Sequence, residues 1–119
     1  MKPNAGKALA LLLIVHLSLA LGCKKSLRDQ MEDYRKEGRY LELSVLCTEH
    51  SEEEFKQICD EAWEQSKNTL DTILSQKASL PFLRITVDPD TKKKVEELLS
   101  KNPHMKERYL KLWKQFVQE

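Results

Sequence analysis

The side chains whose types and spacing could carry chemistry are Cys47, His50 and Cys59. Cys47 and His50 are three positions apart, so one face of a helix could present both to a metal ion. A structural zinc site needs about four such ligands, usually as two close pairs, and this set is too small. A Cys47–Cys59 disulfide needs only that a helical hairpin bring the two Cα atoms within about 4.4–6.8 Å. We therefore predict no metal site and a Cys47–Cys59 disulfide, with two buried thiols as the alternative.

Motifs for catalysis are missing from the sequence. Gly38 is the only glycine after position 22, so no glycine-rich phosphate loop can form. Beyond the N-terminal segment, only His50 and His104 could act as histidine bases. The many carboxylates occupy helical positions that would face solvent. We expect no catalytic residue, no cofactor and no enzymatic activity.

Residues 1–22 have the pattern of an export signal. Lys2 and Lys7 give the segment a basic start, and residues 8–21 are apolar except for His16 and Ser18. As a helix, this run of 14 residues would span roughly 21 Å, less than the ~30 Å hydrocarbon core of a bilayer. The pattern predicts a cleaved signal, with an uncleaved anchor or a buried core helix as the alternatives.

The stretch Ala20-Leu21-Gly22-Cys23 resembles a bacterial lipobox, the motif that precedes a lipid-modified cysteine. Gly22 and Cys23 fit the motif, whereas Ala20 stands where Leu is usual and Leu21 where a small residue is usual. The resemblance covers only the export segment. It implies a lipoprotein that begins at Cys23 and is held to a membrane by lipid on that residue. Ala20 and Gly22 also satisfy the small-x-small rule of ordinary signal peptidase, which would release a soluble secreted protein.

The number of cysteines agrees with the lipoprotein interpretation. Cys23, Cys47 and Cys59 are an odd set in an oxidising compartment, where a leftover thiol needs an explanation. If Cys23 is acylated, the other two cysteines remain as one possible disulfide.

Charge argues against one class of partner. Residues 1–22 hold two lysines and no acidic residue, so their removal lowers Lys+Arg from 20 to 18 against 19 Asp+Glu. A protein that neutralises nucleic-acid phosphates would show a basic excess. We therefore expect no nucleic-acid partner.

Apolar periodicity predicts helices along residues 23–119, which we interpret as one domain. Residues 26–37 have helical spacing and end at Gly38. Residues 39–50 favour a helix, although a buried strand would show a similar apolar run. Residues 51–79 form the clearest helical segment, with Ser51 and Glu54 as a capping box. Its inward stripe comprises Phe55, Cys59, Ala62, Ser66, Leu70 and Ile73.

Two further helix starts follow a connecting segment. Residues 80–87 carry Pro81 and extended-chain residues, so we expect a connection packed on the core. Asp88 and Asn102, each followed by proline, predict the starts of the last two helices. The predicted fold class is all-α, a small bundle of four to five helices.

The last predicted helix carries the candidate partner-binding residues Tyr109, Trp113 and Phe116. Its apolar stripe comprises Met105, Tyr109, Leu112 and Phe116, with Trp113 beside it. With basic residues around them, these aromatic side chains could instead lie on a membrane surface or pack on the 51–79 helix, and we favour that core packing.

The function expected from these patterns is that of a non-enzymatic, lipid-anchored protein of the cell envelope. It would contact the membrane through Cys23 and serve as an interaction, adaptor or assembly module for a protein partner. The alternatives are a soluble secreted helical factor without lipid and an envelope metal-binding protein.

Overall fold

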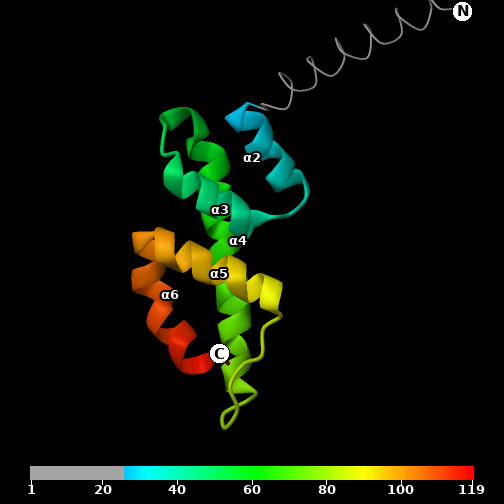
Figure 1. Cartoon of the computed structure of the whole chain (residues 1–119), viewed down its shortest axis with the longest axis vertical. Coiled ribbons are helices and arrows are strands. Elements are labelled where there is room, and N and C mark those ends of the chain that lie inside the picture. The colour runs from blue at the N-terminus through cyan, green and yellow to red at the C-terminus, as the bar shows by residue number, and fades with distance from the viewer. Residues whose placement is uncertain (1–25) are drawn as a thin grey trace, which may run out of the picture. The chain divides into compact units, whose positions relative to one another are not determined.

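The computed structural model describes residues 26–119, so the predicted signal and Cys23 lie outside the described residues. Contacts divide the chain into two units, Met1–Gln30 and Met31–Glu119, which are described separately. Residues 26–119 contain five α-helices and two short 3-10 helices, with no named strand among them (Figure 1). The predicted all-α fold class is confirmed.

Helix α2 (Leu27–Lys36) starts in the first unit and ends in the second. Ser26 caps its beginning, since its hydroxyl accepts a hydrogen bond from the Asp29 N–H at 3.1 Å. Gly38 ends it with a φ of 70°, a left-handed conformation that glycine adopts without steric cost. Hydrogen bonds from Gly38 N to Arg35 O and from Arg39 N to Tyr34 O close this last turn.

The segment that could have been a strand is helix α3 (Tyr40–Glu49). Its buried face carries Leu43, Ser44 and Cys47. The spacing of these residues follows one side of a helix, which explains why the nearly continuous apolar run does not form a strand.

The long helix starts later than the capping box predicted. A 3-10 turn, η1 (Glu53–Phe55), precedes α4 (Lys56–Ser75), and a second 3-10 turn, η2 (Gln76–Ala78), follows it. The N-cap residues of η1 and α4 are Glu52 and Phe55, and neither makes a side-chain cap hydrogen bond, so the predicted capping box with Ser51 as N-cap is wrong. Phe55 is itself buried, and tertiary packing rather than the Ser51 hydroxyl decides where this helix begins. The predicted stripe is confirmed at Cys59, Ala62, Ser66 and Leu70, which are all buried.

The last two helices start where the sequence predicts. The Asp88 carboxylate accepts the Thr91 N–H at 2.9 Å at the start of α5 (Pro89–Lys101). The Asn102 side chain accepts the Met105 N–H at 3.0 Å at the start of α6 (Pro103–Phe116). Both caps satisfy one of the N–H groups that a helix start leaves without an intrahelical partner.

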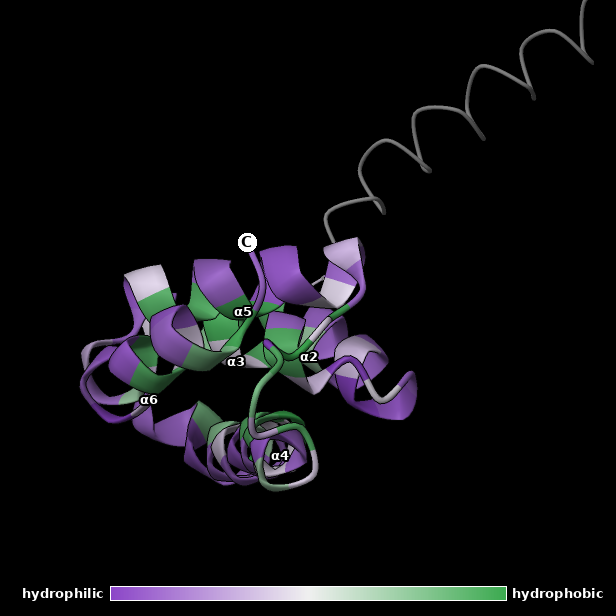
Figure 2. Ribbon diagram, turned by 90° about the horizontal axis from the view of Figure 1, so that it is seen from below, coloured by the Kyte–Doolittle hydropathy of each residue, from purple (hydrophilic) through white to green (hydrophobic). Residues whose placement is uncertain are grey.

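Four helices of the second unit surround a common core. Helix α3 packs on α4 and α5, and α6 packs on the same two helices from the other end, so that each of the four contacts two others (Figure 1). Figure 2 shows hydrophobic parts of α3, α5 and α6 turned toward this interior. The core cluster contains Leu70, Ile85, Val95, Leu98, Leu99, Met105, Tyr109, Trp113 and Val117.

The apolar stripe of α6 differs from the prediction at one position. Trp113 is 3% exposed and Leu112 is 40% exposed, the reverse of the predicted order. Met105, Tyr109 and Trp113 are spaced by four residues each and share one face, so the larger aromatic side chain takes the inward position.

Candidate functional site

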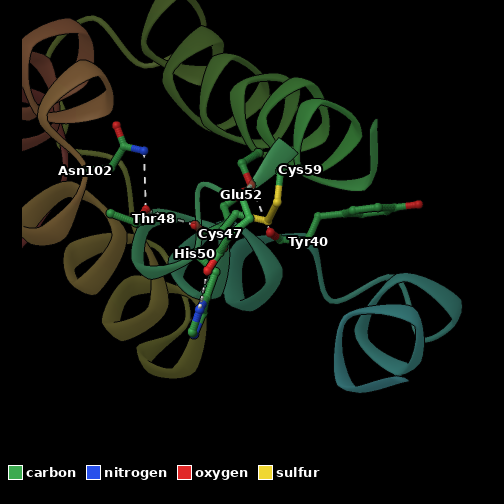
Figure 3. Close-up of a disulfide and its surroundings, with 9 residues drawn as sticks. Tyr40, Cys47, Thr48, His50, Glu52, Cys59 and Asn102 are labelled. Carbon is green, nitrogen blue, oxygen red and sulfur yellow. Dashed lines mark hydrogen bonds and ion pairs between the residues drawn. A yellow bond between two sulfur atoms is a disulfide. The ribbon is translucent and has the colours of Figure 1, made fainter. Parts of the chain in front are cut away.

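The sulfur atoms of Cys47 and Cys59 are joined in a disulfide between α3 and α4 (Figure 3). The Cα atoms lie 5.7 Å apart, within the range that a disulfide spans. Both cysteines are buried. The chain folds back between the two helices, as the predicted helical hairpin required, and the predicted pairing is present in the structure.

The disulfide also bears on whether Cys47, His50 and Cys59 could bind a metal ion. Both thiols are consumed by the bond, which leaves His50 without its two proposed co-ligands. His50 Nδ1 lies 3.9 Å from Glu52 Oε1, an ion pair only when the imidazole is protonated. Within residues 26–119, no group of three His, Cys, Asp or Glu side chains is placed to hold a metal ion. His50 instead borders a hollow of about 270 Å³ beside the disulfide and Trp63.

A chain of hydroxyl and amide groups ties α3 to the joint between α5 and α6. The Thr48 hydroxyl donates to the Ser44 carbonyl oxygen at 2.9 Å. The Asn102 side-chain amide donates to Thr48 Oγ1 at 3.4 Å, and its carbonyl oxygen caps α6 (Figure 3). The Thr48 hydroxyl is thus bonded to a backbone carbonyl and a side-chain amide, and neither of these is a base that would activate it as a nucleophile.

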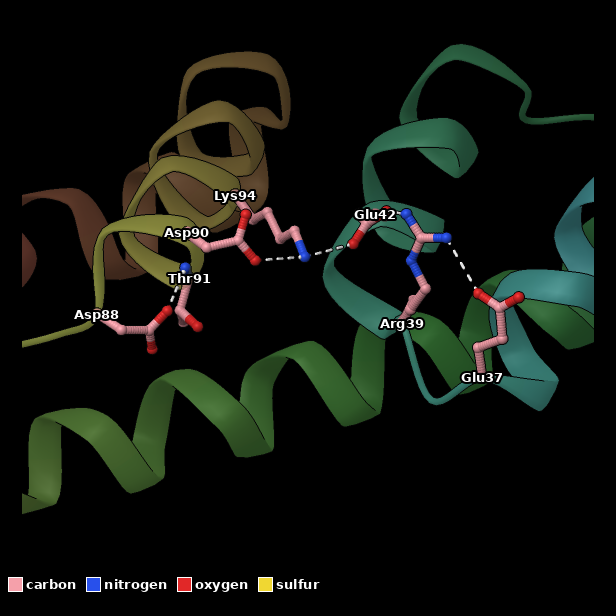
Figure 4. A network of polar contacts seen from close by, with 7 residues as sticks. All are labelled: Glu37, Arg39, Glu42, Asp88, Asp90, Thr91 and Lys94. Carbon is pink, nitrogen blue, oxygen red and sulfur yellow. Dashed lines mark hydrogen bonds and ion pairs between the residues drawn. The ribbon is translucent and has the colours of Figure 1, made fainter.

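Glu42 is the centre of an ion network between the start of α3 and the start of α5 (Figure 4). Arg39 bridges Glu42 and Glu37, and Lys94 bridges Glu42 at 2.7 Å and Asp90 at 2.9 Å. Burial acts to raise the pKa of Glu42, but hydrogen bonds from Arg39 and Lys94 outweigh it and hold that pKa below its ordinary value. A carboxylate kept ionised by two cations suits a tie between helices better than a general base.

The aromatic residues proposed for partner binding lie mostly inside the protein. Tyr109 and Trp113 are 2% and 3% exposed, so neither offers its side chain to a partner in this structure. The Tyr109 hydroxyl donates to Asp71 Oδ1 at 2.9 Å. Burial, and then this hydrogen bond, raise the pKa of Tyr109. Phe116 is half-buried, and Lys77 Nζ lies 5.5 Å from the centroid of its ring.

The most exposed large apolar side chains of the described residues were not predicted from the sequence. Phe82 is 95% exposed and Leu83 is 63% exposed, although residues 80–87 were expected to pack on the core. Ile85 alone fulfils that expectation fully, since it is 0% exposed and pairs with Val117 in a parallel β-bridge. The signal that could have revealed the difference is Pro81, which favours the second position of a β-turn and so lifts the next residues away from the core.

The remaining titratable groups do not gather in one place. His50 and His104 border different hollows, the second with Lys67 and Arg108. A third hollow of about 310 Å³ is lined by Glu49, Glu97 and Lys101, but Lys101 Nζ lies within 3.3 Å of both carboxylates. Lys101 thus bridges the two carboxylates, and both acids of this hollow are engaged in ion pairs.

No helix among the described residues is long and apolar enough to cross a membrane. The chain matches no protein-family model, no curated protein and no solved structure. We therefore infer its function from the residues described above.

Proposed function

We propose that this chain is a non-enzymatic, lipid-anchored protein of the cell envelope that serves as an interaction or adaptor module. The observation that carries the proposal is the Cys47–Cys59 disulfide, which is buried between two core helices. Such bonds form and persist in oxidising compartments outside the cytoplasm and are rare within it. The disulfide therefore supports export, for which the basic and apolar pattern of residues 1–22 is independent support.

The electrostatic pattern supports a role without catalysis. Two of the groups whose pKa values shift hydrogen-bond to partners on neighbouring helices: Glu42 joins α3 to Lys94 of α5, and Tyr109 joins α6 to Asp71 of α4. Active sites instead leave a shifted acid or base accessible to substrate. Here Glu42 and Tyr109 are engaged by side chains of the protein itself, which suits a rigid scaffold.

Attachment through lipid rests on the lipobox-like residues that end at Cys23. Cys23→Ser should move the protein from the membrane to the soluble fraction while the signal is still cleaved. Several acyl chains, at roughly 0.8 kcal/mol per buried CH₂ group, would make attachment effectively permanent in the unchanged protein. Fractionation of cells measures the distribution, and mass spectrometry of the mature N-terminus measures the lipid directly.

The matched control is the double variant Cys47→Ser/Cys59→Ser, which removes the other two cysteines and leaves Cys23. It should still carry lipid and stay with the membrane. Unchanged membrane partitioning of a correctly processed Cys23→Ser protein would refute the lipid anchor.

A soluble secreted factor is the second candidate, favoured by the small residues Ala20 and Gly22. It predicts the same cleavage before Cys23 but an unmodified thiol in the mature protein. The adaptor role itself is tested by a pull-down from membranes with the anchor intact, compared with the Cys23→Ser variant. A partner that is recovered only with the anchored form would connect membrane attachment with binding.

A further inference from the structure

The loop between α4 and α5 ends in a turn that holds two apolar side chains in solvent. We call residues 80–84 the apolar tip; it lies at the lower end of α4 in Figure 1. Leu83 N donates to Leu80 O at 3.2 Å, which closes the turn around Pro81. Lys77 Nζ donates to Leu83 O at 2.8 Å and ties the turn to η2, which follows α4. Phe82 and Leu83, 95% and 63% exposed, are therefore presented by an ordered backbone.

The base of the apolar tip is fixed to the C-terminal end of the chain. Ile85 N donates to Phe116 O at 2.7 Å, and Gln118 N donates to Ile85 O at 2.8 Å. Because Ile85 is 0% exposed, the chain dips into the core immediately after the tip. Phe82 and Leu83 thus stay outside although the core lies two to three residues away. These two adjacent apolar side chains on one turn form a candidate contact surface.

The charged residues in the segment that contains the apolar tip are all basic. Residues 72–87 contain Lys77 and Arg84 and no acidic residue, in a chain whose net charge is only +1. Of the flanking acids, Asp71 accepts the Tyr109 hydroxyl and Asp88 caps α5. A third acid, Glu119, follows Gln118, whose backbone N–H donates to Ile85 O at the base of the tip.

Apolar side chains beside basic ones match the boundary of an anionic bilayer. Aromatic and aliphatic groups enter the boundary between headgroups and acyl chains, and basic side chains near it contact lipid phosphates. Arg84 makes no ion pair among residues 26–119, so its guanidinium is available for that contact.

We infer that the apolar tip is a membrane-contact site of the folded domain, in which Phe82 and Leu83 enter an anionic lipid surface and Arg84 contacts its phosphates. This inference goes beyond the proposed lipid anchor and does not require it. Without lipid on Cys23 the tip would give weak, reversible membrane binding. With lipid it would fix which end of the second unit faces the bilayer.

The test places an indole at the tip of the full-length protein as the cell exports it. The Phe82→Trp protein is added to, or reconstituted in, vesicles of phosphatidylglycerol and phosphatidylcholine with brominated acyl chains, which quench indole fluorescence on contact. The signal of the unchanged protein, from Trp63 and Trp113, is subtracted. We expect strong quenching at position 82, and weaker quenching in vesicles of phosphatidylcholine alone.

Leu112→Trp is the matched control, since Leu112 is the other large apolar side chain that is exposed among the described residues. Its added signal should not be quenched. Adding Arg84→Gln to Phe82→Trp should weaken the contact about fivefold, the loss expected for one basic residue at an anionic surface. Leu83→Trp gives a second probe of the same turn.

Three results would overturn the inference. The first is an absence of quenching at both 82 and 83. The second is equal quenching at 82 and 112, which would mean non-specific adsorption. The third is a change in the fluorescence of the indole at position 82 that occurs only when membrane proteins are present, which would assign the tip to a binding pocket on a protein. Mass spectrometry measures the lipidation of Cys23 separately, so the lipid anchor and the membrane contact of the tip can each be refuted without the other.

Discussion

Ser44 Oγ and Ser66 Oγ lie 2.7 Å apart in the buried contact between α3 and α4. Both residues are 0% exposed. Ser66 Oγ also lies 3.1 Å from the Tyr40 carbonyl oxygen and donates its only proton there. Ser44 must therefore donate to Ser66, and the three groups form a directed chain within the core.

The direction of this chain predicts unequal effects of removing its members. Ser66→Ala leaves the buried Ser44 hydroxyl without its acceptor and should lower the free energy of unfolding by about 1–3 kcal/mol. Ser44→Ala leaves the Ser66 bond to Tyr40 intact and should cost about 1 kcal/mol. The double variant should be no less stable than Ser66→Ala, since no hydroxyl is then stranded. Urea unfolding measures all three, with the exposed Ser75→Ala as control; simple additivity would contradict the chain.

The disulfide should account for a large part of the stability of the domain. A bridge over 12 positions restricts the unfolded chain by about 3 kcal/mol in the chain-entropy model. Cys47→Ala/Cys59→Ala should lower the free energy of unfolding by roughly 2–4 kcal/mol, and a reducing agent should destabilise the unchanged protein but not this variant. Thiol counting on the oxidised, denatured protein should detect neither cysteine. Two reactive thiols from these positions would show that no bridge forms.

The sequence predicted the features of this fold that depend on neighbours along the chain. Asp88 and Asn102 cap helices through their own side chains, and each stands directly before a proline. The inward stripe of α4 follows from a period of 3.6 residues, which also placed Cys59 opposite α3. These signals are local, so they can be read without knowing how the helices pack.

The features that sequence reasoning missed depend on packing between distant segments. Phe55 is buried, and α4 begins after it rather than at Ser51. Trp113 faces the core and Leu112 does not, although the two are neighbours in the sequence. Which of them is buried depends on how α6 packs against the other helices. Phe82 is exposed because Ile85 is held by the end of α6, 32 positions from its partner Val117. No pattern within residues 80–87 reports that contact.

The two helix caps should respond differently to exchange of an amide and a carboxylate. Asn102 is 8% exposed and uses both ends of its amide, one for Met105 N and one for Thr48 Oγ1. Asn102→Asp would place a carboxylate oxygen against the Thr48 oxygen, whose proton already goes to Ser44. We expect a loss of about 1–3 kcal/mol in the free energy of unfolding at neutral pH. Asp88→Asn at the exposed cap is the matched control and should change it by less than about 0.5 kcal/mol. Equal tolerance at both caps would contradict the role given to Thr48.

Asp88 should also contribute to the loss of stability in acid. The Thr91 backbone N–H, with help from the Thr91 side chain, holds the pKa of the Asp88 carboxyl below its ordinary value. A group whose pKa is lower in the folded state stabilises the protein above its unfolded pKa, about 3.9 for aspartate. That stabilisation is lost as the pH falls from the unfolded pKa through the lower pKa of the folded state.

Asp88→Asn keeps a capping side chain but removes the titration, so the free energy of unfolding of this variant should fall less steeply over this pH window than that of the unchanged protein. Urea unfolding between pH 7 and pH 2 measures the slopes, with Glu96→Gln on the same helix as the control for loss of one exposed carboxylate. If Asp88→Asn and Glu96→Gln change the slope equally, the cap is not the source of the pH dependence.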